Sequence, residues 1–101
     1  MNEAAYGMLG ILNRAGLTRF GPNLEKELRK GALLLLAKDA SPKILASYER
    51  NAEALRLPIH YIPSKAELGA PLGRDELTAV LITSRKGAAS LLEKLQKGEQ
   101  S

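Results

Sequence analysis

An unbroken apolar run from Ala32 to Ala37 sets the tightest limit on the fold, and it ends abruptly at the charged pair Lys38 and Asp39. A run of this length is far shorter than the ~20 apolar residues that cross a bilayer, and it is typical of a strand buried on both faces. Ligands commonly bind at the carboxyl ends of such strands. We therefore expect an α/β fold in which Lys38 and Asp39 are candidate binding residues.

Helical and strand patterns alternate along the chain. Apolar spacing predicts helices over about 2–15, 22–30, 42–55 and 64–69 and from 84 onward, and strands over 18–20, 32–37, 58–63 and 77–83. The alternation predicts a single domain over residues 1–101, with its core at about 4–95 and a frayed tail at 97–101. The expected architecture is a three-layer α/β/α sandwich with a mixed, roughly four-stranded sheet. The strands at 32–37, 59–62 and 77–83 should form its centre, and 18–20 an edge.

Local signals refine the helices. Ser41 and Ser84 are placed to cap the third and last helices, and Ser64 with Glu67 forms a capping box. Gly69 should close the short helix that this box opens. The remaining expectations are that Pro22 opens and Gly31 ends the second helix, that Leu24 and Leu28 face the core, and that the third helix buries Ile44, Leu45, Tyr48, Ala52 and Leu55.

Composition excludes several kinds of site. The chain has no cysteine, so it has no disulfide and no thiolate zinc site, which suits a cytoplasmic location. Its only histidine, His60, lies in a strand opposite the face of Ile59 and Tyr61, where a structural or solvent-facing role is the favoured interpretation. No nucleophile elbow or phosphate-binding loop occurs. We expect no enzyme activity, cofactor, metal or membrane partner.

The remaining chemistry is a set of basic and amide side chains in the second helix and in turns. The formal net charge is +4, and the basic and amide residues concerned are Arg19, Asn23, Lys26, Arg29, Lys30, Lys38, Lys65 and Arg74. If the turns meet at one edge of the sheet, the cations would position phosphates and Asn23 could pair with a base edge. A solvated helix face explains the same residues without a ligand, and the residues alone favour that simpler interpretation.

Four motifs in order add a family resemblance. They are Leu9–Leu17 with its Arg14-Ala15-Gly16 core, Gly21–Gly31, Leu33–Pro42 and Leu57–Gly69. Together they resemble the kink-turn-binding ribosomal proteins of the L-seven-Ae and L-thirty-e family, above all its small bacterial YlxQ-type branch, over about residues 4–95. The resemblance implies the same α/β/α sandwich. It also implies recognition of RNA kink-turns, which are sharply bent internal loops with tandem sheared G·A pairs.

The resemblance implies roles for individual residues. The family's binding helix reads roughly Gly-x-Asn-Glu-x-x-Lys; here Leu24 follows the asparagine, and Glu25 and Lys26 are each displaced by one position. The loop from Leu72 to Leu77, apolar in the family, is charged here. Asn23 and Lys26 would read base edges, the cations Arg19, Arg29, Lys30, Lys38, Lys65 and Arg74 would position the backbone, and Gly21, Glu25 and Asp39 would complete the site.

The leading expectation is a monomeric, non-enzymatic, cytoplasmic protein that binds structured RNA such as a kink-turn in ribosomal RNA, with the ribosome as a candidate partner. The displaced glutamate and the charged loop leave two alternatives open. One is a protein-interaction adaptor that kept the fold but lost kink-turn recognition. The other is an accessory subunit of an RNA-modifying enzyme.

Overall fold

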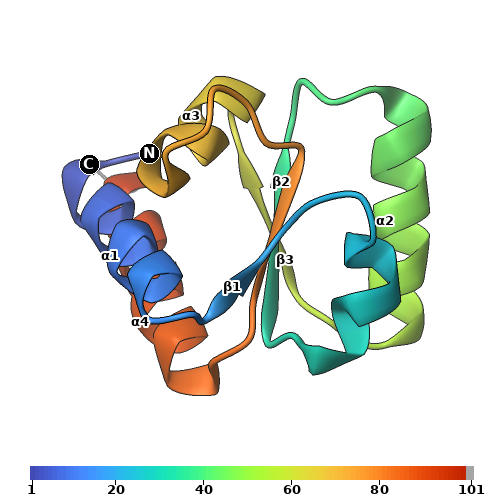
Figure 1. Cartoon of the computed structure of the whole chain (residues 1–101), viewed down its shortest axis with the longest axis horizontal. Helices are drawn as coiled ribbons and strands as arrows, with labels where there is room; N and C mark the ends of the chain where they lie inside the picture. The colour runs from blue at the N-terminus through green and yellow to red at the C-terminus, as the bar shows by residue number, and fades with distance from the viewer. Residues whose placement is uncertain (100–101) are drawn as a thin grey trace.

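Helices cover both faces of a four-stranded sheet in the computed structural model, which describes residues 1–99 (Figure 1). The elements in chain order are α1 (Glu3–Arg14), β1 (Thr18–Arg19), η1 (Leu24–Lys30), β2 (Leu33–Ala37), α2 (Pro42–Ala54), β3 (Ile59–Ile62), α3 (Lys65–Gly69), η2 (Ala70–Leu72), β4 (Ala79–Ile82) and α4 (Arg85–Glu99). The strand order is β1-β4-β2-β3, with β2 parallel to β3 and β4 antiparallel to both β1 and β2. The predicted sandwich with a mixed sheet is confirmed.

β2 needs its unbroken apolar run because each of its faces packs against a different helical layer. Leu33 and Leu35 belong to one hydrophobic cluster, and Leu34 and Leu36 to the other. All four side chains are fully buried. Full burial of one such side chain contributes roughly 1.5–3 kcal/mol, so neither face of this strand tolerates a polar residue.

The two faces of the sheet are covered by different numbers of helices. Figure 1 shows α1, α3 and α4 on one side of the sheet, and α2 with the short helix η1 on the other. The first layer packs on Val80 and Ile82 of β4, and the second on Ala79 and Leu81. This alternation along β4 confirms that it too is covered on both faces.

Side-chain caps start four of the helices, and the caps at Ser41, Ser64 and Ser84 confirm predictions from the sequence. The side-chain oxygens of Asn2, Ser41, Ser64 and Ser84 each accept a hydrogen bond from the amide three residues ahead, at 2.8, 3.3, 3.1 and 2.9 Å. These bonds satisfy amides that the first helical turn leaves unpaired. The Glu67 carboxylate accepts from the amino group of Met1, and among residues 1–99 no hydrogen bond joins it to the Ser64 amide, so only the serine half of the predicted capping box forms.

The segment after β1 differs from the predicted helix 22–30. It is a 3-10 helix that begins at Leu24, and Pro22 lies in the turn before it. Leu24 and Leu28 are buried and Gly31 ends the helix, as predicted. A 3-10 helix rises about 2 Å per residue, against about 1.5 Å for an α-helix, so a short segment can run alongside the whole length of β2.

Two predicted core residues of α2 are exposed instead. Ile44 and Leu55 are 43% and 39% exposed, whereas Ala52 is buried and Leu45 and Tyr48 are partly buried. The cause is length: a helix of this size spans about 20 Å, more than the roughly 16 Å of β2 beneath it. Both ends of α2 therefore extend past the sheet.

One further prediction about the sheet is wrong. β3 lies at an edge and not at the centre, because β1 pairs with β4 on the other side of the sheet. The α-helix α3 ends at Gly69 as predicted, and the 3-10 helix η2 follows it directly. α4 extends to Glu99, and residues 100 and 101 lie outside the described part of the chain, so the frayed tail expected at 97–101 stays a prediction.

Candidate functional site

A groove of about 800 Å³ lies beside the carboxyl end of β2. One wall is the turn Phe20–Pro22, which follows the edge strand β1, and the other is the loop 73–77, which precedes β4. The two walls come from distant parts of the sequence and meet because β1 and β4 are antiparallel neighbours.

A second hollow of about 330 Å³ continues the groove over the start of α2. Ile44 and Tyr48 line it together with Thr78 and Ala79, and the two hollows share Gly21, Pro22, Glu76 and Leu77. The site therefore combines charged walls with an apolar floor.

Arg74 bridges the two walls. Its guanidinium carbon lies 5.1 Å from the centroid of the Phe20 ring, within the range of a cation–π contact. This contact holds the positive charge over the groove.

Hydrogen bonds to Lys65 hold the second wall in place. The Lys65 amide donates to Asp39 Oδ1 at 2.8 Å, and its carbonyl accepts from the Leu77 amide at 3.0 Å. Its ammonium nitrogen lies 3.4 Å from Glu76 Oε2. The predicted residues Asp39, Lys65 and Arg74 thus lie at one end of the sheet, but part of the positive charge of Lys65 is already compensated.

Two glycines shape the walls. Gly21 has φ of 112°, a conformation that L side chains rarely adopt. Gly69 lies under the second wall, where a Cβ would stand 2.8 Å from the Arg74 carbonyl oxygen and 3.1 Å from the Glu76 backbone. Gly69 is therefore a close-approach position that lets the loop pack onto α3.

The 3-10 conformation of η1 determines which of its side chains lie in the same row along the helix. With three residues per turn, Asn23, Lys26 and Arg29 fall in one row, and all three are exposed. Asn23 directly follows the first wall of the groove. Glu25 instead turns to α2, where its carboxylate accepts from Ser47 Oγ and Asn51 Nδ2, each at 3.2 Å. Glu25 fastens the two elements together.

The other predicted site residues lie elsewhere. The Arg19 guanidinium donates to the carbonyls of Gly16 and Thr18, so it folds back on the α1–β1 turn. Lys38 lines a separate cavity on the α1 and α4 side. Arg29 lines a pocket at the opposite end of the sheet, and Lys30, also at the far end of η1, lies 4.0 Å from Glu27 Oε1. The structure therefore does not gather all the predicted cations into one rim.

Three groove residues, Phe20, Ile44 and Tyr48, were not predicted as site residues. Helical spacing predicts Ile44 and Tyr48 in the core, and the only signal against this is that Ile44 lies two residues after the helix-opening Pro42. Burial, and secondly the negative charge of Glu25, raise the pKa of Tyr48, so its hydroxyl stays protonated and can donate a hydrogen bond.

Within residues 1–99, no group of three or more histidine, aspartate or glutamate side chains could hold a metal ion. No helix in that range has the length and apolar character needed to span a bilayer. The arrangement at the groove is one of binding groups: a fixed arginine, a protonated phenol, an exposed amide and apolar side chains.

Comparison with known proteins finds similar sequences and similar folds. The chain is 29% identical over 93 residues to the RNA-binding protein YlxQ of Bacillus subtilis (strain 168). The matched region covers 89% of this chain and 93% of that protein. A solved structure of a protein with unknown function from Bacillus halodurans C superposes with a TM-score of 0.74 at 21% identity, over 88% of this chain and 98% of that one. The second likeness concerns the fold. No family model matches the sequence.

Proposed function

We propose that this chain is a non-enzymatic RNA-binding protein whose groove beside the carboxyl end of β2 receives a kink-turn or a similarly bent RNA. The observation that carries the proposal is the likeness to YlxQ, a protein named for RNA binding, over most of both chains. The groove supports it with chemistry of the right kind. Bent and non-helical RNA elements present splayed bases and closely spaced phosphates, which call for apolar surface and fixed cations together.

Each part of the groove has a role in this proposal. Arg74 meets a phosphate, and the Tyr48 hydroxyl donates to a phosphate or sugar oxygen. Ile44 and Leu77 contact a base that is turned out of the stack. Asn23 and Lys26, one above the other at the start of η1, reach base edges, since an amide side chain and an ammonium group can both pair with purine edges.

A gel-shift titration tests the proposal. Kink-turn RNA is compared with a control RNA in which Watson–Crick pairs replace the tandem G·A pairs. Tight binding to the first RNA alone is expected, with Asn23→Ala and Lys26→Ala each weakening it by about 1–3 kcal/mol. Equal binding to both RNAs would remove the kink-turn claim, and no binding to either would remove the RNA claim.

A second candidate is a protein-interaction adaptor with the same fold. The specific observation in its favour is the charge balance of the groove, where Asp75 and Glu76 stand beside Arg74 and Glu76 compensates Lys65. An adaptor would bind RNA weakly and without the steep loss of affinity with salt that phosphate contacts produce. The same titration at two salt concentrations separates the two candidates.

A further inference from the structure

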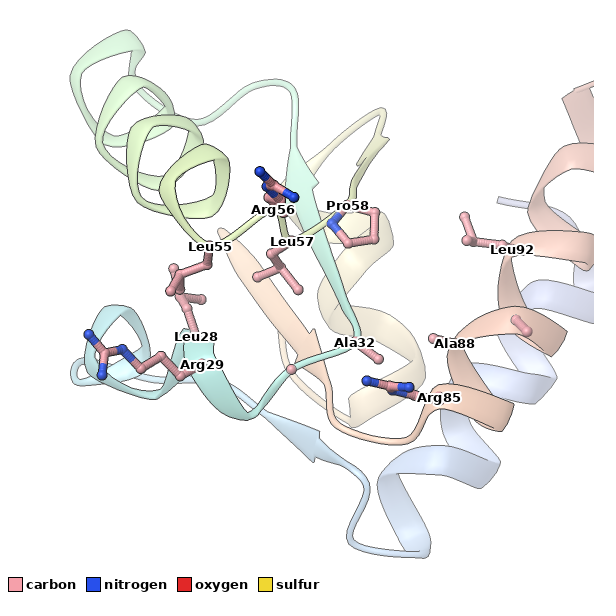
Figure 2. A pocket seen from close by; sticks show the side chains of 12 residues that line it. Leu28, Arg29, Ala32, Leu55, Arg56, Leu57, Pro58, Arg85, Ala88 and Leu92 are labelled. Atoms are coloured by element: carbon pink, nitrogen blue, oxygen red, sulfur yellow. The ribbon is translucent and has the colours of Figure 1, made fainter.

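A second groove, of about 500 Å³, lies at the opposite end of the sheet, where Gly31 and Ala32 lead into β2 (Figure 2). The loop 55–58 after α2 forms one side, and the first two turns of α4 form the other. The groove therefore crosses from one helical layer to the other past the end of the sheet, far from the groove described above.

The chemistry of this groove is apolar below and cationic around the rim. Figure 2 shows Arg56 next to Leu57, Arg85 next to Ala32, and Arg29 on the far side. The apolar surface comes from Leu28, Ala32, Leu55, Leu57, Pro58, Ala88, Ala89 and Leu92. No lining residue is acidic or aromatic.

The three arginines have no internal ionic partner. All three side chains are exposed, and none forms an ion pair with any residue of the described chain. Leu55 adds a large apolar side chain that is 39% exposed. Apolar surface framed by uncompensated cations is complementary to a ligand that is apolar on one side and anionic on the other.

Two of the arginines stand where local structure disfavours them. Arg56 has φ of 54°, in the left-handed region, at the position that ends α2 with hydrogen bonds from its amide to Glu53 and from the Leu57 amide to Ala52. Glycine is the usual residue at such a position. Arg85 lies in the first turn of α4, near the positive end of the helix dipole. Residues that break local rules in this way are expected at functional sites.

We propose that this arginine-rimmed groove binds an acidic, amphipathic segment of a partner protein. The segment would place aliphatic side chains on Leu55, Leu57 and Leu92, and carboxylates against Arg56 and Arg85. RNA fits this groove less well than the first one, because no aromatic side chain lines it for base stacking. The proposal is independent of RNA binding at the first groove.

Peptide display tests the proposal without knowledge of the natural partner. Random peptides of about 15 residues, roughly four helical turns, are selected on the wild-type protein after depletion on an Arg56→Gly/Arg85→Ala variant. Enrichment of sequences with Asp or Glu interleaved with Leu, Ile or Phe is expected. The variant relieves a left-handed arginine and an unfavourable helix-dipole contact, so its thermal unfolding midpoint should equal or exceed that of the wild type, and lost binding would not reflect unfolding.

Affinity measurements complete the test. The best enriched peptide should bind the wild type at least tenfold more tightly than Arg56→Gly or Arg85→Ala. The matched controls Arg50→Ala and Lys86→Ala, exposed cations outside the groove, should bind like the wild type. Enrichment of peptides without acidic residues would overturn the proposal, and so would equal affinity of the best peptide for all variants. It would also be overturned if the groove bound a single-stranded RNA and not the peptide, and Arg56→Gly weakened that RNA binding.

Discussion

The guanidinium carbon of Arg74 lies 5.1 Å from the centroid of the Phe20 ring, and this contact joins two segments that are far apart in the sequence. An exposed cation–π pair contributes only about 0.5–1 kcal/mol. Its larger consequence is positional, because it holds a positive charge between the two walls of the groove at the carboxyl end of β2.

Replacing Arg74 by alanine should weaken binding of kink-turn RNA and reduce the slope of log affinity against log salt by about 1, since one phosphate contact is lost. Stability should fall by no more than about 1 kcal/mol. Fluorescence anisotropy at several salt concentrations measures the slope. Arg50→Ala, an exposed cation on α2, is the control, and an unchanged slope for Arg74→Ala would remove this residue from the contact.

Glu76→Gln should strengthen RNA binding. The change removes a negative charge from the groove and frees the Lys65 ammonium, which lies 3.4 Å from Glu76 Oε2. Glu76 is 62% exposed, so stability should change by less than about 1 kcal/mol. Glu93→Gln breaks a comparable exposed pair with Lys97 on α4 and should leave RNA affinity unchanged. Equal effects of the two changes would indicate a general charge effect and not a local one.

Much of this fold follows from local sequence, because its central strands are covered on both faces. The runs of β2 and β4 have no polar interruption, and this predicts two strands buried between two helical layers. The serines that cap α2 and α4 mark their starts. The errors have long-range causes: β3 is an edge because β1 pairs with β4 on the other side of the sheet, and α2 extends beyond a shorter sheet at Ile44 and Leu55.

The candidate site was less predictable for the same reason. Residue types alone cannot show that Arg74 meets Phe20, since this depends on the antiparallel pairing of β1 with β4. Residue types alone also cannot show that η1 runs from one end of the sheet to the other. This path places Arg29 at the second groove. Asp39 and Lys65 were easier to place, because both follow the carboxyl ends of parallel neighbouring strands.

Gly69→Ala should destabilise the protein by about 1–3 kcal/mol and weaken RNA binding. The added Cβ would stand 2.8 Å from the Arg74 carbonyl oxygen, so the loop that forms the second wall must shift. Gly7→Ala is the matched control, because nothing lies within 4 Å of its Cβ and alanine is favoured in a helix by about 0.5–1 kcal/mol. Urea unfolding of both variants and the wild type measures the difference in stability. If Gly69→Ala were as stable as the wild type, the loop would adapt freely to the added Cβ.

Tyr61 should make stability depend on alkaline pH. Its hydroxyl donates to the Glu49 carboxylate, and this bond first, then burial and the negative charge of Glu49, raise the pKa of Tyr61 above its ordinary value near 10. The stability that this raised pKa contributes is fully present below about pH 10, the pKa of tyrosine in the unfolded chain, and is lost as pH rises through the higher pKa of Tyr61 in the folded protein.

Tyrosinate absorbance titration checks this. Glu49→Gln should lower the pKa of Tyr61 toward its ordinary value, and the stability difference between the wild type and Tyr61→Phe should shrink as Tyr61 ionises. A Glu49→Gln titration that overlays the wild type would contradict the assigned cause.

Amide chemical shifts of the labelled protein, followed as kink-turn RNA is added, locate the RNA contact residue by residue. RNA binding at the groove beside the carboxyl end of β2 predicts the largest changes at Gly21, Asn23 and residues 74–77, with little change at Arg56, Leu57 and Arg85. Changes centred on those last three residues, or spread evenly over the surface, would contradict it.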